Sequence, residues 1–215
     1  MPADQPLPVI NQKSDDAALL ARAFCLLLDP GRPVDPGELA AVLRRDPADV
    51  TTALGRLARA GRLRRNPAGQ VVGSHGLSIL PTRHELVIDG TRRWTWCAWD
   101  AVGILGALGA SGQVHSTSPQ SGAPIELTFD PGRAPASDVV VFLAADETRD
   151  SVVDNWCPLV NFFEHAKAAA AWASSHGVPG RALSLEEATA TGTVAWQRWL
   201  GTRADQLEQT DAEQG

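Results

Sequence analysis

The segment that most constrains the fold is WCAWDAVGILGAL at residues 96–108, where Asp100 is the one charged residue among apolar residues and glycines. The apolar residues after Cys97 suit a buried helix. A buried helix has to be covered by other elements, and segments bounded by Gly, Pro and Asp predict strands near it. These strand candidates are residues 84–88, 112–118, 124–130 and 139–144. Several strands mixed with separate helices predict an α+β fold with a mixed sheet and flanking helices.

The N-terminal third of the chain carries signals for three helices and a hairpin. Residues 15–28 have helical apolar spacing, and each of the pairs Asp35-Pro36 and Asp46-Pro47 places an N-cap before a proline at the first helical position. Two short strands around a Pro-Ala-Gly turn follow, which completes a winged-helix-like pattern. We therefore predict a flexible N-terminus at 1–14, a winged-helix-like domain at 15–77, a catalytic domain at 78–202 and a flexible tail at 203–215.

Signals in the last third of the chain predict two further helices. An alanine-rich segment ends at Gly177, which suits the residue after a helix C-terminus. Ser184 and Glu187 have the spacing of a capping box, so a final helix is expected to run through Trp199.

Composition narrows the classes of function. The chain has 215 residues and a net charge of −6, which argues against nucleic-acid binding by the whole molecule. No apolar run reaches the roughly 18 residues that a membrane span requires, and residues 1–16 lack the features of a signal peptide. Three cysteines are too few for a disulfide framework. These features predict a cytoplasmic protein with free thiols.

Cys97 and Asp100 are the first candidate site residues. If a helix begins at Cys97, the two side chains lie at positions i and i+3 on one face. Burial would raise the pKa of the carboxyl and let it carry a proton near neutral pH. The pKa of the Cys97 thiol would fall if the nearby Arg92 and Arg93 turn toward it. A Cys-x-x-Asp spacing is nevertheless a weak signal, because free cysteines are usually core residues.

Cys157 is the second candidate thiol, in the segment NWCPL. Pro158 disfavours helical backbone at the residue before it, so we expect Cys157 in a loop or at a strand end. Cys25 lies in the apolar segment FCLLL and is interpreted as a core residue. Two thiols and a carboxylate are too few for a closed zinc site, and the five histidines show no motif spacing. The set suits a thiophilic metal held by two sulfurs, of which mercury is the extreme case.

Four segments together resemble the organomercurial (alkylmercury) lyase family over about residues 15–200. They are WCAWDAVGILGALG, SGAPIELTF, NWCPLVNFF and AWASSHG. The resemblance implies an enzyme of mercury resistance that breaks the carbon–mercury bond of R–Hg⁺ by protonolysis, giving RH and Hg²⁺. It implies that Cys97 and Cys157 bind mercury as substrate and product, with no other cofactor, and that Asp100 moves the proton. Trp96, Trp99 and Trp156 are expected to contact the substrate. That family often has a further cysteine where this chain reads HSTSPQSGAP.

The partners implied are an organomercurial, cellular thiols that remove Hg²⁺ and, through the family alone, a mercuric reductase. Two alternatives stay open: a winged-helix metal-responsive transcriptional regulator, or a relative that binds mercury without catalysis. The hypothesis of a transcriptional regulator depends on the arginines at 56, 59, 62, 64 and 65. They would have to form a continuous basic surface to contact DNA phosphates. The expected recognition helix offers no Asn or Gln to read bases, and we expect no nucleic-acid or membrane partner.

Overall fold

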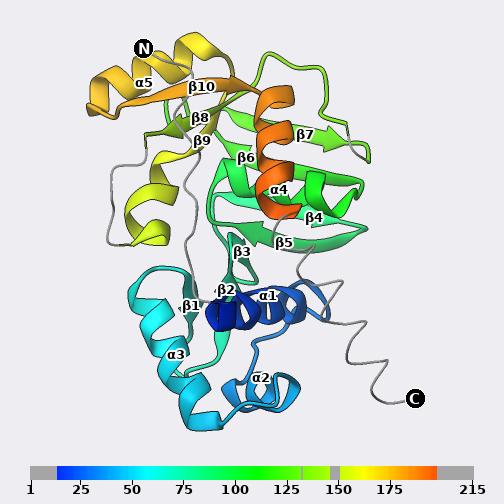
Figure 1. Cartoon of the computed structure of the whole chain (residues 1–215). Coiled ribbons are helices and arrows are strands. Elements are labelled where there is room, and N and C mark those ends of the chain that lie inside the picture. The colour runs from blue at the N-terminus through cyan, green and yellow to red at the C-terminus, as the bar shows by residue number, and fades with distance from the viewer. Residues whose placement is uncertain (1–13, 132, 146–150, 198–215) are drawn as a thin grey trace.

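A computed structural model describes residues 14–131, 133–145 and 151–197 of the chain (Figure 1). The predicted flexible N-terminus, apart from its last residue, the predicted flexible tail and the end of the last helix at Trp199 lie outside these ranges. The elements are helices and antiparallel strands, which confirms the α+β class. Within the described residues, no helix is both long enough and apolar enough to cross a lipid bilayer.

The predicted N-terminal helices are α1 (Ser14–Leu28), α2 (Pro36–Val42) and α3 (Pro47–Arg59). Asp35 and Asp46 are their N-caps as expected: each carboxylate accepts a hydrogen bond from a backbone N–H in the first turn of α2 or α3. The three helices gather at one end of the molecule (Figure 1). The hairpin predicted after them consists of β1 (Leu63–Arg65) and β2 (Val71–Ser74).

A seven-stranded sheet runs from this hairpin through the middle of the molecule. Its order is β1-β2-β3-β5-β4-β6-β7, and every pair is antiparallel. The remaining strands are β3 (Leu77–Ser78), β4 (His84–Ile88), β5 (Thr91–Thr95), β6 (Gly112–Thr117) and β7 (Pro124–Phe129). The N-terminal hairpin and the predicted catalytic region therefore share one hydrogen-bonded sheet. The predicted domain boundary, between residues 77 and 78, falls within β3.

The buried helix predicted after Cys97 is α4 (Ala98–Leu108), and its residues from Ala98 to Leu105 are all buried. It contacts β4 and β5 of the large sheet and also two strands of a second sheet. That sheet has the order β10-β8-β9, and its strands are β8 (Val140–Ala144), β9 (Asn161–Phe163) and β10 (Gly180–Ser184). Because both sheets cover α4, the helix has no broad solvent-exposed face, and its sequence therefore lacks an amphipathic pattern.

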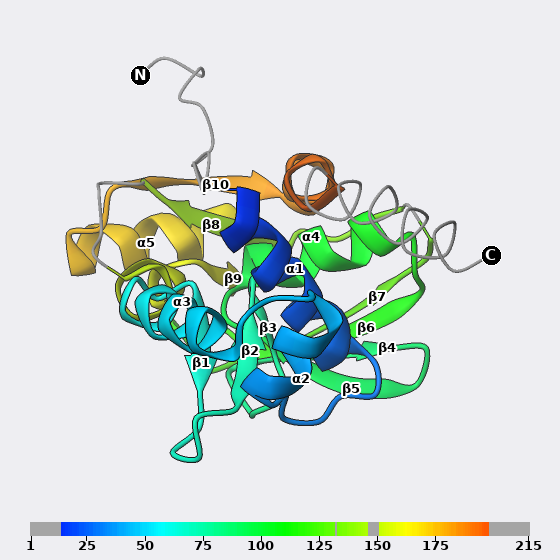
Figure 2. The same ribbon diagram turned by 60° about the horizontal axis from the view of Figure 1, so that its bottom comes forward.

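Two helices complete the described chain. Helix α5 (Ala166–His176) contacts the strands of the small sheet and ends at Gly177, whose left-handed backbone was expected there. A last helix over residues 185–197 begins where the Glu187 N–H donates to the Ser184 hydroxyl, as the capping signal predicted. Figure 2 shows it on the same side of the large sheet as α4.

Arg93 on β5 joins the large sheet to the N-terminal helices. Its guanidinium donates to the carbonyl oxygens of Leu27 and Leu28 at the C-terminal end of α1, where the helix dipole favours a cation. The side chain is buried, and it passes so close to Gly31 that a Cβ there would meet the guanidinium. Arg93 is therefore part of the contact between α1 and the sheet and does not turn toward Cys97.

Candidate active site

Cys97 is the N-cap of α4, so the Cys-x-x-Asp spacing is also a helix capping box. The backbone N–H of Cys97 donates to Asp100 Oδ2 at 3.0 Å, and the N–H of Asp100 donates to Cys97 Sγ at 3.4 Å. A capping box usually pairs Ser or Thr with Glu. Here a thiol and a shorter carboxylate replace them, which brings both reactive groups to the same helix turn.

Cys157 reaches the same place from a distant segment. A short π-helix, η1 (Val152–Trp156), precedes it, and Cys157 opens a 3-10 turn, η2 (Cys157–Leu159). Val160, just after this turn, accepts a hydrogen bond from the N–H of Ala98, which ties η2 to the first turn of α4. The two cysteine segments are thus joined through their backbones as well as through their side chains.

The expectation of a loop or strand end at Cys157 is wrong. Its backbone is helical, with φ −54° and ψ −39°, although Pro158 follows it. Proline disfavours this conformation in the preceding residue without forbidding it. The turn is held by a hydrogen bond from the Val160 N–H to the Cys157 carbonyl and by burial of the cysteine in the core. Tertiary packing therefore outweighs the local preference.

One ligand atom from each of Cys97, Asp100 and Cys157 lies within 4.8 Å of the other two. We call these three residues the thiol–carboxylate cluster. All are buried, with exposed fractions of 0, 5 and 2 %. No other group of three such ligands meets this distance in the described residues. Cys25, the third cysteine, is buried in α1 and belongs to the core as expected.

Burial controls the protonation of the cluster. It raises the pKa of Asp100 to about 7, although hydrogen bonds from the thiol and the backbone N–H of Cys97 act to lower it. Burial, the hydrogen bond to Cys157 and the charge of Asp100 raise the pKa of the Cys97 thiol well above its usual value. A hydrogen bond from Cys97 lowers the pKa of Cys157, but burial and the charge of Asp100 together raise it. The cluster therefore keeps its thiol protons until a cation replaces them.

The expectation of a lowered thiol pKa at Cys97 is therefore wrong. Arg93 bonds to the end of α1, and Arg92 forms an ion pair with Glu85 on the neighbouring strand. Neither guanidinium compensates the desolvation of the thiol. The helix N-terminus remains favourable to an anion, but it contributes less than burial.

The three expected substrate-binding tryptophans have different surroundings. Trp99 and Trp156 are buried, and their rings meet edge to face with centroids 6.2 Å apart. Trp196, from the last helix, also packs edge to face against Trp99, with ring centroids 5.0 Å apart. Trp96 is only partly buried and lies against Gly73 of β2. Trp99 and Trp156 directly precede Asp100 and Cys157 in the sequence, so the ring contact joins the two segments that carry the thiol–carboxylate cluster.

Sequence reasoning missed Trp196 and the turn between β2 and β3. The indole N–H of Trp196 donates to the His75 carbonyl in that turn. A Cβ on Gly103 of α4 would lie 2.5 Å from the Trp196 ring, so a small residue in α4 makes room for the indole. The glycines at 103 and 106 in an apolar helix were the available signal, because they permit a second helix to approach closely.

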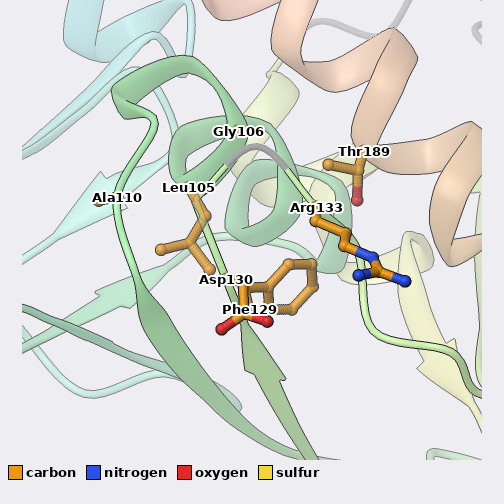
Figure 3. A pocket seen from close by; sticks show the side chains of 7 residues that line it. All are labelled: Leu105, Gly106, Ala110, Phe129, Asp130, Arg133 and Thr189. Carbon is orange, nitrogen blue, oxygen red and sulfur yellow. The ribbon is translucent and has the colours of Figure 1, made fainter.

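A surface pocket lies at the far end of α4 from the cluster. Figure 3 shows its lining side chains, from α4, the end of β7 and the last helix. They are Leu105, Gly106, Ala110, Phe129, Asp130, Arg133 and Thr189. None of them belongs to the thiol–carboxylate cluster, so this pocket is not the place where the reactive groups meet a substrate.

The arginines that suggested a DNA-binding surface are largely engaged within the protein. Arg56 binds Asp16 of α1 through two hydrogen bonds, and Arg64 pairs with Asp154 of η1. Arg65 donates to a backbone carbonyl of its own hairpin. The first contact joins α3 to α1, and the second joins β1 to the segment before Cys157. All three leave less free positive charge for phosphate binding.

Comparisons of the sequence with a family model and with individual proteins identify the same family. A family model described as alkylmercury lyase matches residues 77–197. Proteins named alkylmercury lyase from Streptomyces lividans and Staphylococcus epidermidis are 32 and 29 % identical, with 74 and 86 % of each relative covered, and 74 and 89 % of this chain. One from Bacillus cereus is 32 % identical over 64 % of this chain, and the match spans 62 % of that relative's length.

A solved structure supports the same fold. The crystal structure of the mercury-bound form of MerB2 aligns with a TM-score of 0.81 and 23 % identity. The alignment covers 88 % of this chain and 93 % of that one. It extends beyond the region of the family match, so the likeness includes much of the N-terminal helices as well as the two sheets.

Proposed function

The chain belongs to the alkylmercury lyase family, and we propose that it cleaves the carbon–mercury bond of organomercurials by protonolysis, releasing a hydrocarbon and Hg²⁺. The observation that carries the proposal is the thiol–carboxylate cluster: two thiols and a carboxyl with ligand atoms within 4.8 Å of one another. Thiols bind soft metals, and a carboxyl with a pKa of about 7 can both take and give a proton near neutral pH.

The first step is exchange of the mercury onto the protein. Cys97 or Cys157 loses its proton and replaces the group that R–Hg⁺ carried, and the released proton leaves with that group. The cation removes the reason for the high thiol pKa values, because it supplies the positive charge that the buried sulfurs lack. The second thiol then passes its proton to the Asp100 carboxylate and also binds mercury.

The second step breaks the carbon–mercury bond. Two thiolates donate electron density to mercury, so the bonding pair of the carbon–mercury bond moves toward carbon. The Asp100 carboxylic acid delivers its proton to that carbon, RH leaves, and Asp100 is again a carboxylate. Hg²⁺ stays on the two sulfurs. Of the two thiol protons, one has left with the displaced group and one is in the hydrocarbon, so atoms and charge balance.

The tryptophans serve the apolar part of the substrate in this proposal. Trp99 and Trp156 offer ring surfaces beside the two reactive segments, and Trp96 offers a third at the start of the cysteine turn. Exclusion of water by these rings favours proton transfer to carbon, because a dry site strengthens the electrostatic effect of the carboxyl. The cluster is buried, so binding requires these side chains to move.

Product release needs partners that compete for mercury. We propose that cellular thiols, or a mercuric reductase that presents thiols, remove Hg²⁺ from Cys97 and Cys157. A reducing cytoplasm is the expected setting, because the three cysteines are free and the reaction needs two of them reduced. The released metal leaves the protein ready for another substrate.

The test is turnover of phenylmercury with excess small thiol, with benzene followed by gas chromatography. The wild type and a Cys25→Ala control, which removes a thiol outside the cluster, should release benzene. Cys97→Ala, Cys157→Ala and Asp100→Asn should lose it. Mercury binding without benzene in the wild type would instead identify a binding protein, and equal activity in Asp100→Asn would remove the carboxyl from the mechanism.

A further inference from the structure

Two hairpin turns in the large sheet have nearly the same backbone but different surroundings. His75-Gly76 joins β2 to β3 with φ values of 49° and 82°, and Asp89-Gly90 joins β4 to β5 with 48° and 77°. Positive φ at both central residues is the type I′ geometry that two-residue hairpins favour. In both turns, the positive φ of the second central residue is therefore a local reason for glycine at that position.

Only the first of these turns approaches the thiol–carboxylate cluster. A Cβ added to Gly76 would lie 2.4 Å from both Cγ and Oδ1 of Asp100, and 2.8 Å from its Cβ. A Cβ added to Gly90 would meet nothing within 4 Å. Gly76 is therefore in contact with the carboxylate itself, in addition to meeting the demands of the turn.

The carboxylate is held from two sides. Asp100 Oδ2 accepts the N–H of Cys97 at 3.0 Å, and Oδ1 lies 2.4 Å from the position that a Cβ on Gly76 would take. Two hydrogen bonds fix the β2–β3 turn itself. The Gly76 carbonyl accepts the N–H of Trp96 at 2.8 Å, and the His75 carbonyl accepts the indole N–H of Trp196. Two other segments of the chain, the end of β5 and the last helix, thus support the turn against which the carboxylate lies.

We infer that Gly76 is a positioning residue for Asp100: the β2–β3 turn is the wall that keeps the carboxylate directed at the two thiols. The inference rests on the proposed function and adds a part to it. It also gives the N-terminal hairpin a role at the site, since β2 continues into this wall. The two nearest atoms belong to the carboxylate and the third is the Asp100 Cβ, so a methyl group at position 76 displaces the Asp100 side chain.

The experiment compares Gly76→Ala with Gly90→Ala. Both replace glycine at a φ near 80°, so both carry the same local strain. In single turnover with phenylmercury, Gly76→Ala should release benzene about 100-fold more slowly, as expected for misplacement of a reacting group by about 1 Å. Gly90→Ala should stay near the wild-type rate. Both variants should still bind Hg²⁺ on Cys97 and Cys157, read as protection of these thiols from alkylation by mass spectrometry.

A second comparison asks whether Gly76 acts through Asp100. In an Asp100→Asn background, where the proton donor is already lost, Gly76→Ala should not lower whatever residual benzene release a long incubation detects. Equal rates for Gly76→Ala and Gly90→Ala, or loss of mercury protection together with rate in Gly76→Ala, would overturn the inference. Wild-type protein that releases no benzene would instead defeat the proposed function.

Folding provides a readout that does not depend on activity. If Gly76→Ala fails to fold, Asp100→Gly is added to it and to Gly90→Ala. Recovery of folding in the Gly76→Ala pair supports the contact, because this truncation removes all three Asp100 atoms nearest to the new methyl group. Failure of that pair to fold while the Gly90→Ala pair folds overturns it.

Discussion

Replacement of Asp100 by asparagine should make the metal-free protein more stable at and above neutral pH. The carboxyl is buried, no cationic side chain among the described residues pairs with it, and its pKa rises from 3.8 to about 7 in the folded state. The folded state therefore binds the proton more tightly than the unfolded chain. The contribution of Asp100 to the unfolding free energy is greatest below pH 3.8 and is lost as the pH rises through 7. Over that range the folded protein must either bury a charge or keep a proton that the unfolded chain releases.

The size of the effect follows from the two pKa values. A difference of roughly three pKa units corresponds to about 4 kcal/mol of unfolding free energy once the pH exceeds both values. Asparagine has nearly the same shape, carries no charge and can still accept the Cys97 N–H through its amide oxygen. The variant should therefore gain about 1 kcal/mol over the wild type at pH 4.5 and about 4 kcal/mol at pH 8.

Urea unfolding under reducing conditions at several pH values between 4.5 and 8 measures this directly. Asp138→Asn is the matched control, since Asp138 is exposed and the same substitution there should change little at any pH. A stability difference for Asp100→Asn that does not grow with pH, or that is absent at pH 8, would refute the assignment of a raised pKa to this carboxyl. It would also weaken its proposed role as a proton carrier.

Three further predictions concern stability away from the cluster. Arg93→Met should cost about 2–4 kcal/mol in urea unfolding, because buried carbonyls at the end of α1 lose a charged donor, whereas Arg92→Met at the exposed ion pair should cost less than about 1 kcal/mol; equal costs would show that the α1 contact adds nothing. His84 is buried with a folded pKa of about 3 against 6.5 unfolded, so the unfolded chain takes up the proton first and stability falls as pH drops below 6.5. That loss of unfolding free energy reaches about 2 kcal/mol at pH 5. In His84→Gln, the unfolding free energy at pH 7.5 should therefore exceed that at pH 5 by about 2 kcal/mol less than in the wild type, and an equal difference in both proteins would contradict the prediction. Asp46→Ala should lower the unfolding free energy by about 1 kcal/mol through loss of the α3 N-cap, and Asp46→Asn, which also caps, should restore most of it.

Short-range features of the site were predictable from the sequence. The three-residue spacing of Cys97 and Asp100 places them together once a helix begins there, and the run of apolar residues after them requires that helix to be buried. The helix starts at Asp35 and Asp46 and the turn at Asp89-Gly90 are likewise set by local backbone chemistry. The division into domains after residue 77 stays a prediction; it falls within β3, which pairs with β2 in one sheet.

Only the tertiary structure decided which distant groups complete the site. Cys157 lies 60 positions after Cys97 in the sequence, and its helical backbone before a proline runs against the local preference. The approach of Gly76 to Asp100 and of Trp196 to Trp99 has no counterpart in sequence spacing. Covalent geometry fixes neighbours within a helix turn, so the sequence determined the Cys-x-x-Asp pair. Contacts between separate segments depend on how both sheets pack around α4, and this packing determined the second thiol, the wall behind the carboxyl and the direction of Arg93.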